Sequence, residues 1–315
     1  MTTVRATLLA ALAGVLLASA PAAAQEGGQQ EAAQEDGASP GSGIVVTGEL
    51  PTPSEVSRQA RDVTDIGSDL RDRPLARVED RLCPGVLGLK RYAAELMVDR
   101  IRWNAERLNM WLADDTDCTP NLIIAFVEDG KTTLAEMVDH QPWLFETMTR
   151  PQREALLAED GPVRVWTTAE TRTRDGMRIA RRDSLTDPPQ VEMWMAHSKI
   201  YLTIREDITQ VVVLFDRAGV RGKSVIQLAD YATMRGFART RPAEGDAALD
   251  TILALFDPAH EPPAELTAFD QAYLRNLYKE IANLPAANRL LDVSAELERL
   301  SREQDAATPE AATSE

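Results

Sequence analysis

ITQVVVLFD, residues 208–216, and SVIQLADYATMRGFA, residues 224–238, are the consecutive segments that decide the fold of this chain. The first segment is rich in β-branched and other apolar residues over the length of one strand, which predicts a β-strand. The second segment begins at Ser224 and has Gln227 three residues later, which is the capping-box pattern of a helix start. We therefore expect a strand that leads into a capped helix.

Other segments of strand and helix character lie upstream of this pair. The strand-like segments are NLIIAFVE (121–128), VRVWTT (163–168), a weaker one at 177–181, VEMWMA (191–196) and KIYLTI (199–204). Apolar residues three or four apart predict helices over 92–112 and 131–139, and a Pro in the first turn marks another at 151–158. From Ser224 onward the pattern is almost entirely helical. A mixed sheet followed by a helical half predicts an α+β fold.

Two short signatures follow the capped helix, TILALFDP at 251–258 and LTAFDQAYLRNLY at 266–278. The order of segments from residue 209 to 278 resembles the C-terminal half of a metzincin-type zinc protease. That half consists of an active-site helix, a Met-turn and a closing helix that starts at an Asp and ends in LY. The resemblance implies a zincin-like fold for about 70 of the 315 residues, with Leu253 or Leu255 in place of the Met.

The zinc ligands of that family are missing from the helix. The family places two His four residues apart, a Glu beside the first and a third His further on, so that the side chains meet at one metal. In one register these positions hold Gln227, Leu228, Tyr231 and Phe237. In a second register, which matches Gly236 and Asp230 to the family's Gly and Glu, the His positions hold Ala229, Thr233 and Arg239. Neither set can bind zinc as the family does.

The remaining polar face of this helix is the candidate binding cleft. We assign to it Gln227, Asp230, Tyr231 and Met234. The alternative is a buried scaffold helix whose Gln227 and Tyr231 are satisfied locally. The three histidines, His140, His197 and His260, lie in three separate segments. We therefore assign no catalytic residue, no metal ligand and no cofactor.

The two ends of the chain differ in composition from its middle. Residues 1–24 have the basic start, apolar run and small-residue site of a signal peptide, which predicts cleavage near Ala24 and a periplasmic or secreted protein. We expect a disordered acidic linker over 25–55, one globular domain over 56–289, and a C-terminal helix with an acidic tail over 290–315. These tails contribute most of the net charge of −16, which argues against nucleic acid as a partner. No transmembrane segment is expected in the mature chain.

The two cysteines, Cys83 and Cys118, form an isolated pair. No His or third Cys lies at metal-ligand spacing from them, and an exported protein meets an oxidising compartment. The pair therefore predicts one disulfide that closes a loop of about 36 residues.

Three functional hypotheses follow. The first is a non-catalytic, zincin-like domain that binds a peptide or a protein. The second is a hydrolase with a site of another kind. The third is an envelope docking protein that uses GIVVTGE, residues 43–49, which resembles the TonB-box region of outer-membrane transporters. The mature chain is also similar to a family of exported proteins from sphingomonad-type bacteria, which implies export and no particular activity.

Overall fold

The computed structural model describes residues 51–66, 70–114, 118–179, 186, 198–243, 249–279 and 281–307. The chain divides into two units, Met1–Gly48 and Glu49–Glu315, and the description below concerns the second. The expected signal peptide, most of the linker, the 43–49 segment, the strand at 191–196 and the last eight residues lie outside the described residues.

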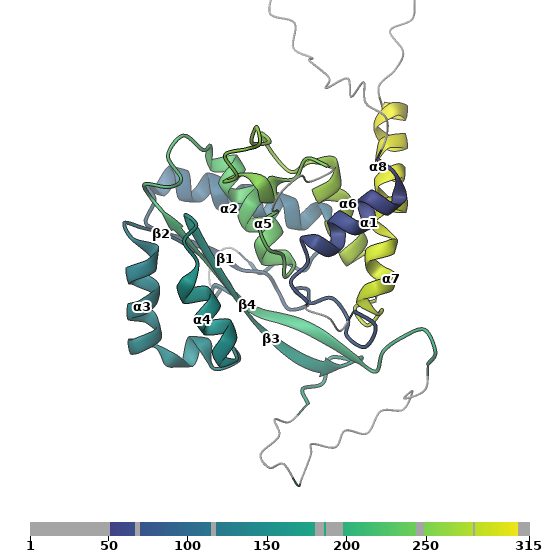
Figure 1. Cartoon of the computed structure of the whole chain (residues 1–315), viewed down its shortest axis with the longest axis horizontal. Coiled ribbons are helices and arrows are strands. Elements are labelled where there is room, and N and C mark those ends of the chain that lie inside the picture. The colour runs from purple at the N-terminus through teal and green to yellow at the C-terminus, as the bar shows by residue number, and fades with distance from the viewer. Residues whose placement is uncertain are drawn as a thin grey trace, which may run out of the picture. The chain divides into compact units, whose positions relative to one another are not determined.

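A mixed four-stranded sheet forms the centre of this unit (Figure 1). Its strands are β1 (Pro84–Leu87), β2 (Leu122–Val127), β3 (Val163–Thr173) and β4 (Ile204–Asp216), in the order β1-β2-β4-β3. β1, β2 and β4 run parallel, and β3 pairs antiparallel with β4 along the edge. The expected α+β fold with a mixed sheet is therefore confirmed.

The central strands are apolar on both faces because a layer of helices covers each face. In β4, Val211, Val213 and Phe215 point into the larger core, whereas Val212 and Leu214 point into a smaller one. Alternate residues of a strand face opposite sides, so a strand buried on both sides shows an unbroken apolar run. The run VVVLF at 211–215 is the clearest case.

Helices α2 and α5 cover one face of the sheet, and α3 and α4 cover the other (Figure 1). The bounds are α2 (Arg91–Arg107), α3 (Gly130–His140), α4 (Arg150–Ala158) and α5 (Val225–Phe237), with a 3-10 turn at Pro142–Phe145. Further helices extend the larger core, namely α1 (Pro53–Asp62), α6 (Ala268–Tyr278), α7 (Ala286–Leu291) and α8 (Val293–Ala307), with a second 3-10 turn at Ile252–Ala254. None of the described helices combines the length and the apolar composition that crossing a membrane requires.

Two upstream predictions are corrected by the structure. The helix expected over 92–112 ends at Arg107, because Asn109 adopts φ +54°, the left-handed conformation that terminates helices. The strand expected over 199–204 begins only at Ile204. The Ser198 hydroxyl accepts hydrogen bonds from the backbone N–H groups of Ile200 and Tyr201, which holds these residues in a turn.

The ends of the globular unit reach further than the sequence predicted. Helix α1 starts at Pro53, inside the stretch expected to be linker, and Thr52 and Glu55 form its capping box. Helix α8 continues to Ala307 and packs against α1 and α6, with Leu297 and Leu300 in the core. The C-terminal helix therefore belongs to the globular fold.

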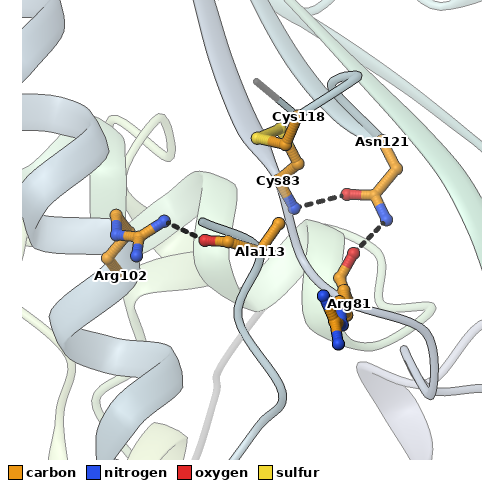
Figure 2. The surroundings of a disulfide bond; sticks show 6 residues. All are labelled: Arg81, Cys83, Arg102, Ala113, Cys118 and Asn121. Carbon is orange, nitrogen blue, oxygen red and sulfur yellow. Dashed lines mark hydrogen bonds between the residues drawn. A yellow bond between two sulfur atoms is a disulfide. The ribbon is translucent and has the colours of Figure 1, made fainter. Parts of the chain in front are cut away.

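The predicted disulfide joins Cys83 to Cys118, with their Cα atoms 6.1 Å apart (Figure 2). It ties the start of β1 to the segment that enters β2. Asn121 reinforces this junction, because its side chain accepts from the Cys83 N–H at 2.8 Å and donates to the Arg81 carbonyl at 2.9 Å. The disulfide thus closes the loop that contains α2.

A buried carboxyl at the start of α6 makes the stability depend on pH. Burial raises the pKa of Asp270 to about 6, although hydrogen bonds from Thr251, Ile252 and Thr267 oppose the shift. This pKa lies above the value of about 4 in the unfolded chain, so the folded state binds the proton more tightly. The resulting contribution to the unfolding free energy is fully present below pH 4 and is lost as the pH rises through 6. We expect the unfolding free energy of the wild type, relative to Asp270→Asn, to fall by about 2–3 kcal/mol from pH 4 to pH 7.

Urea denaturation of both proteins at unit intervals of pH measures this difference. The variant is the control for all other titrating groups, because only Asp270 is absent from it. If the difference in unfolding free energy between the two proteins stays constant with pH, the raised pKa of Asp270 is contradicted.

Candidate functional site

Helix α5 lies in the interior of the fold. The capping box is confirmed, since the Ser224 hydroxyl accepts from the Gln227 N–H and the Gln227 side chain accepts from the Ser224 N–H. Every residue from Leu228 to Phe237 is buried. The helix is therefore the scaffold element of the alternative reading, and its polar face does not form an open cleft.

The four candidate cleft residues have separate roles in this packing. Gln227 caps the helix and donates its side-chain N–H to the Pro263 carbonyl at 2.7 Å. Tyr231 packs against Phe215 and Phe256, and its hydroxyl accepts from Arg235 at 2.8 Å. Met234 is fully buried in the core. The prediction that these residues line a binding cleft is wrong for Tyr231 and Met234, because apolar neighbours enclose both.

Asp230, the fourth candidate, is fully buried and holds three segments together. Its carboxylate accepts two hydrogen bonds from the Arg100 guanidinium, at 2.8 and 2.6 Å, and one from the Asn104 amide at 2.8 Å. It also accepts from the Leu266 backbone N–H at 2.9 Å. The hydrogen bonds to Asp230 raise the pKa of Arg100. Asp230 thereby orients two side chains of α2, Arg100 and Asn104.

A pocket of about 60 Å³ opens beside this buried cluster. We call it the α2–α6 pocket. One wall consists of Arg100, Trp103, Asn104 and Arg107 from α2, and the opposite wall includes Leu266 and Leu274. The polar anchor at Asp230 thus lies beneath a surface pocket that combines cations, an aromatic ring and aliphatic side chains.

The indole of Trp103 is the most exposed apolar group at the pocket, with 42 % of its surface accessible. The guanidinium groups of Arg100 and Arg107 both lie 4.5 Å from its ring centroid. Each such cation–π contact contributes about 0.5–1 kcal/mol at an exposed site. Trp103 therefore forms an exposed aromatic platform flanked by two cations.

Asn104 carries a polar atom whose hydrogen bonding is incomplete. The residue is only 3 % exposed, and its amide N–H group donates to Asp230 and to the Thr233 hydroxyl. These two acceptors fix the orientation of the amide. Its oxygen, Oδ1, is buried and has no hydrogen-bond partner among the described residues. An unpaired buried acceptor of this kind costs about 1–3 kcal/mol.

A second cavity, of about 210 Å³, offers less to a ligand. It lies between the segment that follows α1 and Tyr273 in the middle of α6. Its charged residues already pair with one another, Arg73 with Glu206 at 3.0 Å and Arg239 with Asp65 at 3.2 Å. We therefore take the α2–α6 pocket as the candidate functional site.

The histidines do not converge within the described part of the chain. His140 ends α3, His260 contacts Asp257 at 3.2 Å, and His197 lies outside the described residues. Among the residues that the structure describes, no three His, Cys, Asp or Glu side chains are grouped as metal ligands would be.

The face of α2 that lines the pocket was not among the predicted site residues. Only the apolar stripe of this helix was considered, although Arg100, Trp103, Asn104 and Arg107 follow the spacing of one helical face. That spacing could have predicted this wall of the pocket from the sequence. The opposite wall could not be predicted, because its residues lie more than 150 positions away in the chain.

Comparisons with protein families, curated proteins and solved structures found no match to this chain.

Proposed function

We propose that this protein is an exported, non-catalytic domain that binds a peptide segment in the α2–α6 pocket. The observation that carries the proposal is the exposed indole of Trp103 beside a pocket that combines cations with aliphatic side chains. The side chains of a bound peptide can pack on this indole. Tryptophan is among the residue types most enriched at binding hot spots.

Two further observations support the other parts of the proposal. The disulfide between Cys83 and Cys118 supports export, because such bonds persist in oxidising compartments. The succession of α5, the 3-10 turn Ile252–Ala254 and α6 is the order that the zincin resemblance requires. At the ligand positions within α5 every residue except Gln227 is buried, which supports a binding role in place of zinc catalysis.

The test compares two exposed tryptophans on a peptide array. The purified protein is applied to random hexapeptides, tethered in one set by the N-terminus and in the other by the C-terminus. We expect Trp103→Ala to lower the affinity for the captured peptides at least tenfold, because it removes the aromatic platform of the pocket. Trp143→Ala is the matched control: Trp143 is 61 % exposed and lies in the 3-10 turn on the opposite side of the sheet.

The control variant is expected to bind as the wild type does. Equal losses in both variants, or no peptide captured by the wild type on either set, would overturn the proposed function.

A further inference from the structure

The α2–α6 pocket has a cation at its mouth that no described carboxylate neutralises. Arg107 is exposed, and its described contacts are the Trp103 ring and a long hydrogen bond of 3.4 Å to the Gln271 side chain. Arg100 differs, because Asp230 and Glu265 both pair with it. Arg275 also lines the pocket, and it pairs with Glu303 at 3.1 Å. Arg107 is therefore the group available to an anion.

The floor of the same pocket is apolar and small. Leu108, Leu266 and Leu274 line it. A volume of about 60 Å³ holds roughly four to six water-sized groups, which is the size of a valine or leucine side chain. The pocket therefore fits one aliphatic side chain of a peptide that lies at its mouth.

We infer that the pocket recognises the C-terminal residue of its peptide ligand. This inference rests on the proposed function. The terminal carboxylate binds the Arg107 guanidinium, and the aliphatic side chain of the last residue occupies the apolar floor. Charge-assisted bonds to arginine are the strongest that a carboxylate makes at a protein surface.

A terminus fits these two features better than an internal acidic residue does. The last residue of a peptide carries a carboxylate and can also carry an aliphatic side chain, so it meets both Arg107 and the apolar floor. An internal Asp or Glu has its negative charge on the side chain, so it would bring that charge to the apolar floor, where desolvation opposes it.

The test uses one peptide in two forms. Acetyl-Ala-Ala-Leu with a free carboxylate and the same peptide as a C-terminal amide are titrated into the full protein by ¹⁵N NMR. The indole N–H signal of Trp103, assigned with Trp103→Phe, reports binding. We expect the free acid to bind at least tenfold more tightly than the amide. In Arg107→Gln the ratio should fall to about one while the amide affinity stays unchanged.

Arg91→Gln is the matched control, because it removes the same charge from a fully exposed arginine at the other end of α2. It should keep the wild-type ratio. Equal binding of the acid and the amide by the wild type would overturn this inference and leave the proposed function standing. If neither form binds while the array does capture peptides, the inference also fails. If the array captures none either, both proposals fail.

Discussion

Asp230→Ala should lower the unfolding free energy by about 3 kcal/mol, because it removes one partner of a buried ion pair. The carboxylate is fully buried and accepts four hydrogen bonds, from Arg100, Asn104 and the Leu266 backbone. Without it, the Arg100 guanidinium, whose side chain is 14 % exposed, keeps among the described residues the ion pair with Glu265 and the contact with the Trp103 ring. Arg100 and Asn104 both line the α2–α6 pocket, so the substitution should also weaken peptide binding.

Glu265→Gln is the matched control for this prediction. It removes the other carboxylate that contacts Arg100, but Glu265 is 62 % exposed and such surface pairs contribute less than about 1 kcal/mol. Urea denaturation of both variants separates the two roles. A loss below 1 kcal/mol in Asp230→Ala, or equal losses in the two variants, would show that Asp230 is not the anchor between α2 and α5.

The parts of the fold that were predictable from the sequence are those with strong local signals. The apolar runs of β2 and β4 and the capping boxes at Ser224 and Thr267 each specify their own structure within a few residues. The capping box at Thr52 had the same strength, but it was overlooked because the surrounding stretch is acidic and polar. Local signals therefore predicted individual strands and helices. The acidic, polar composition around Thr52 led to the wrong prediction of a linker where α1 begins.

The candidate site was not predictable in the same way, because its walls come from distant parts of the chain. Asp230 was singled out as a cleft residue, yet it is a buried anchor whose partner Arg100 is 130 positions away. A helix flanked by another helix and a sheet buries all its faces, and the periodicity of α5 alone does not reveal how many neighbours it has. The pocket is instead lined by one face of α2 and by residues between 265 and 275, whereas only the apolar stripe of the α2 segment was considered in the sequence.

Loss of the Cys83–Cys118 disulfide should lower the unfolding free energy by about 4 kcal/mol. The bond spans 35 positions in the sequence, and cross-linking a loop of this length removes that amount of conformational entropy from the unfolded chain. The loop contains α2, which packs against α5 and carries one wall of the pocket. β1 adds little to hold this loop, because it is an edge strand of four residues.

Urea denaturation with and without reductant, on the wild type and on Cys83→Ala/Cys118→Ala, measures this contribution. Reductant should destabilise the wild type and leave the variant unchanged, because the variant has no disulfide to lose. Asn121→Ala separates the covalent bond from the hydrogen bonds beside it, since Asn121 binds the Cys83 N–H and the Arg81 carbonyl (Figure 2). We expect Asn121→Ala to cost about 1–3 kcal/mol and to retain the response to reductant. A wild type that loses less than 1 kcal/mol on reduction would mean that the packing of α2 on α5, and not the disulfide, holds the pocket wall in place.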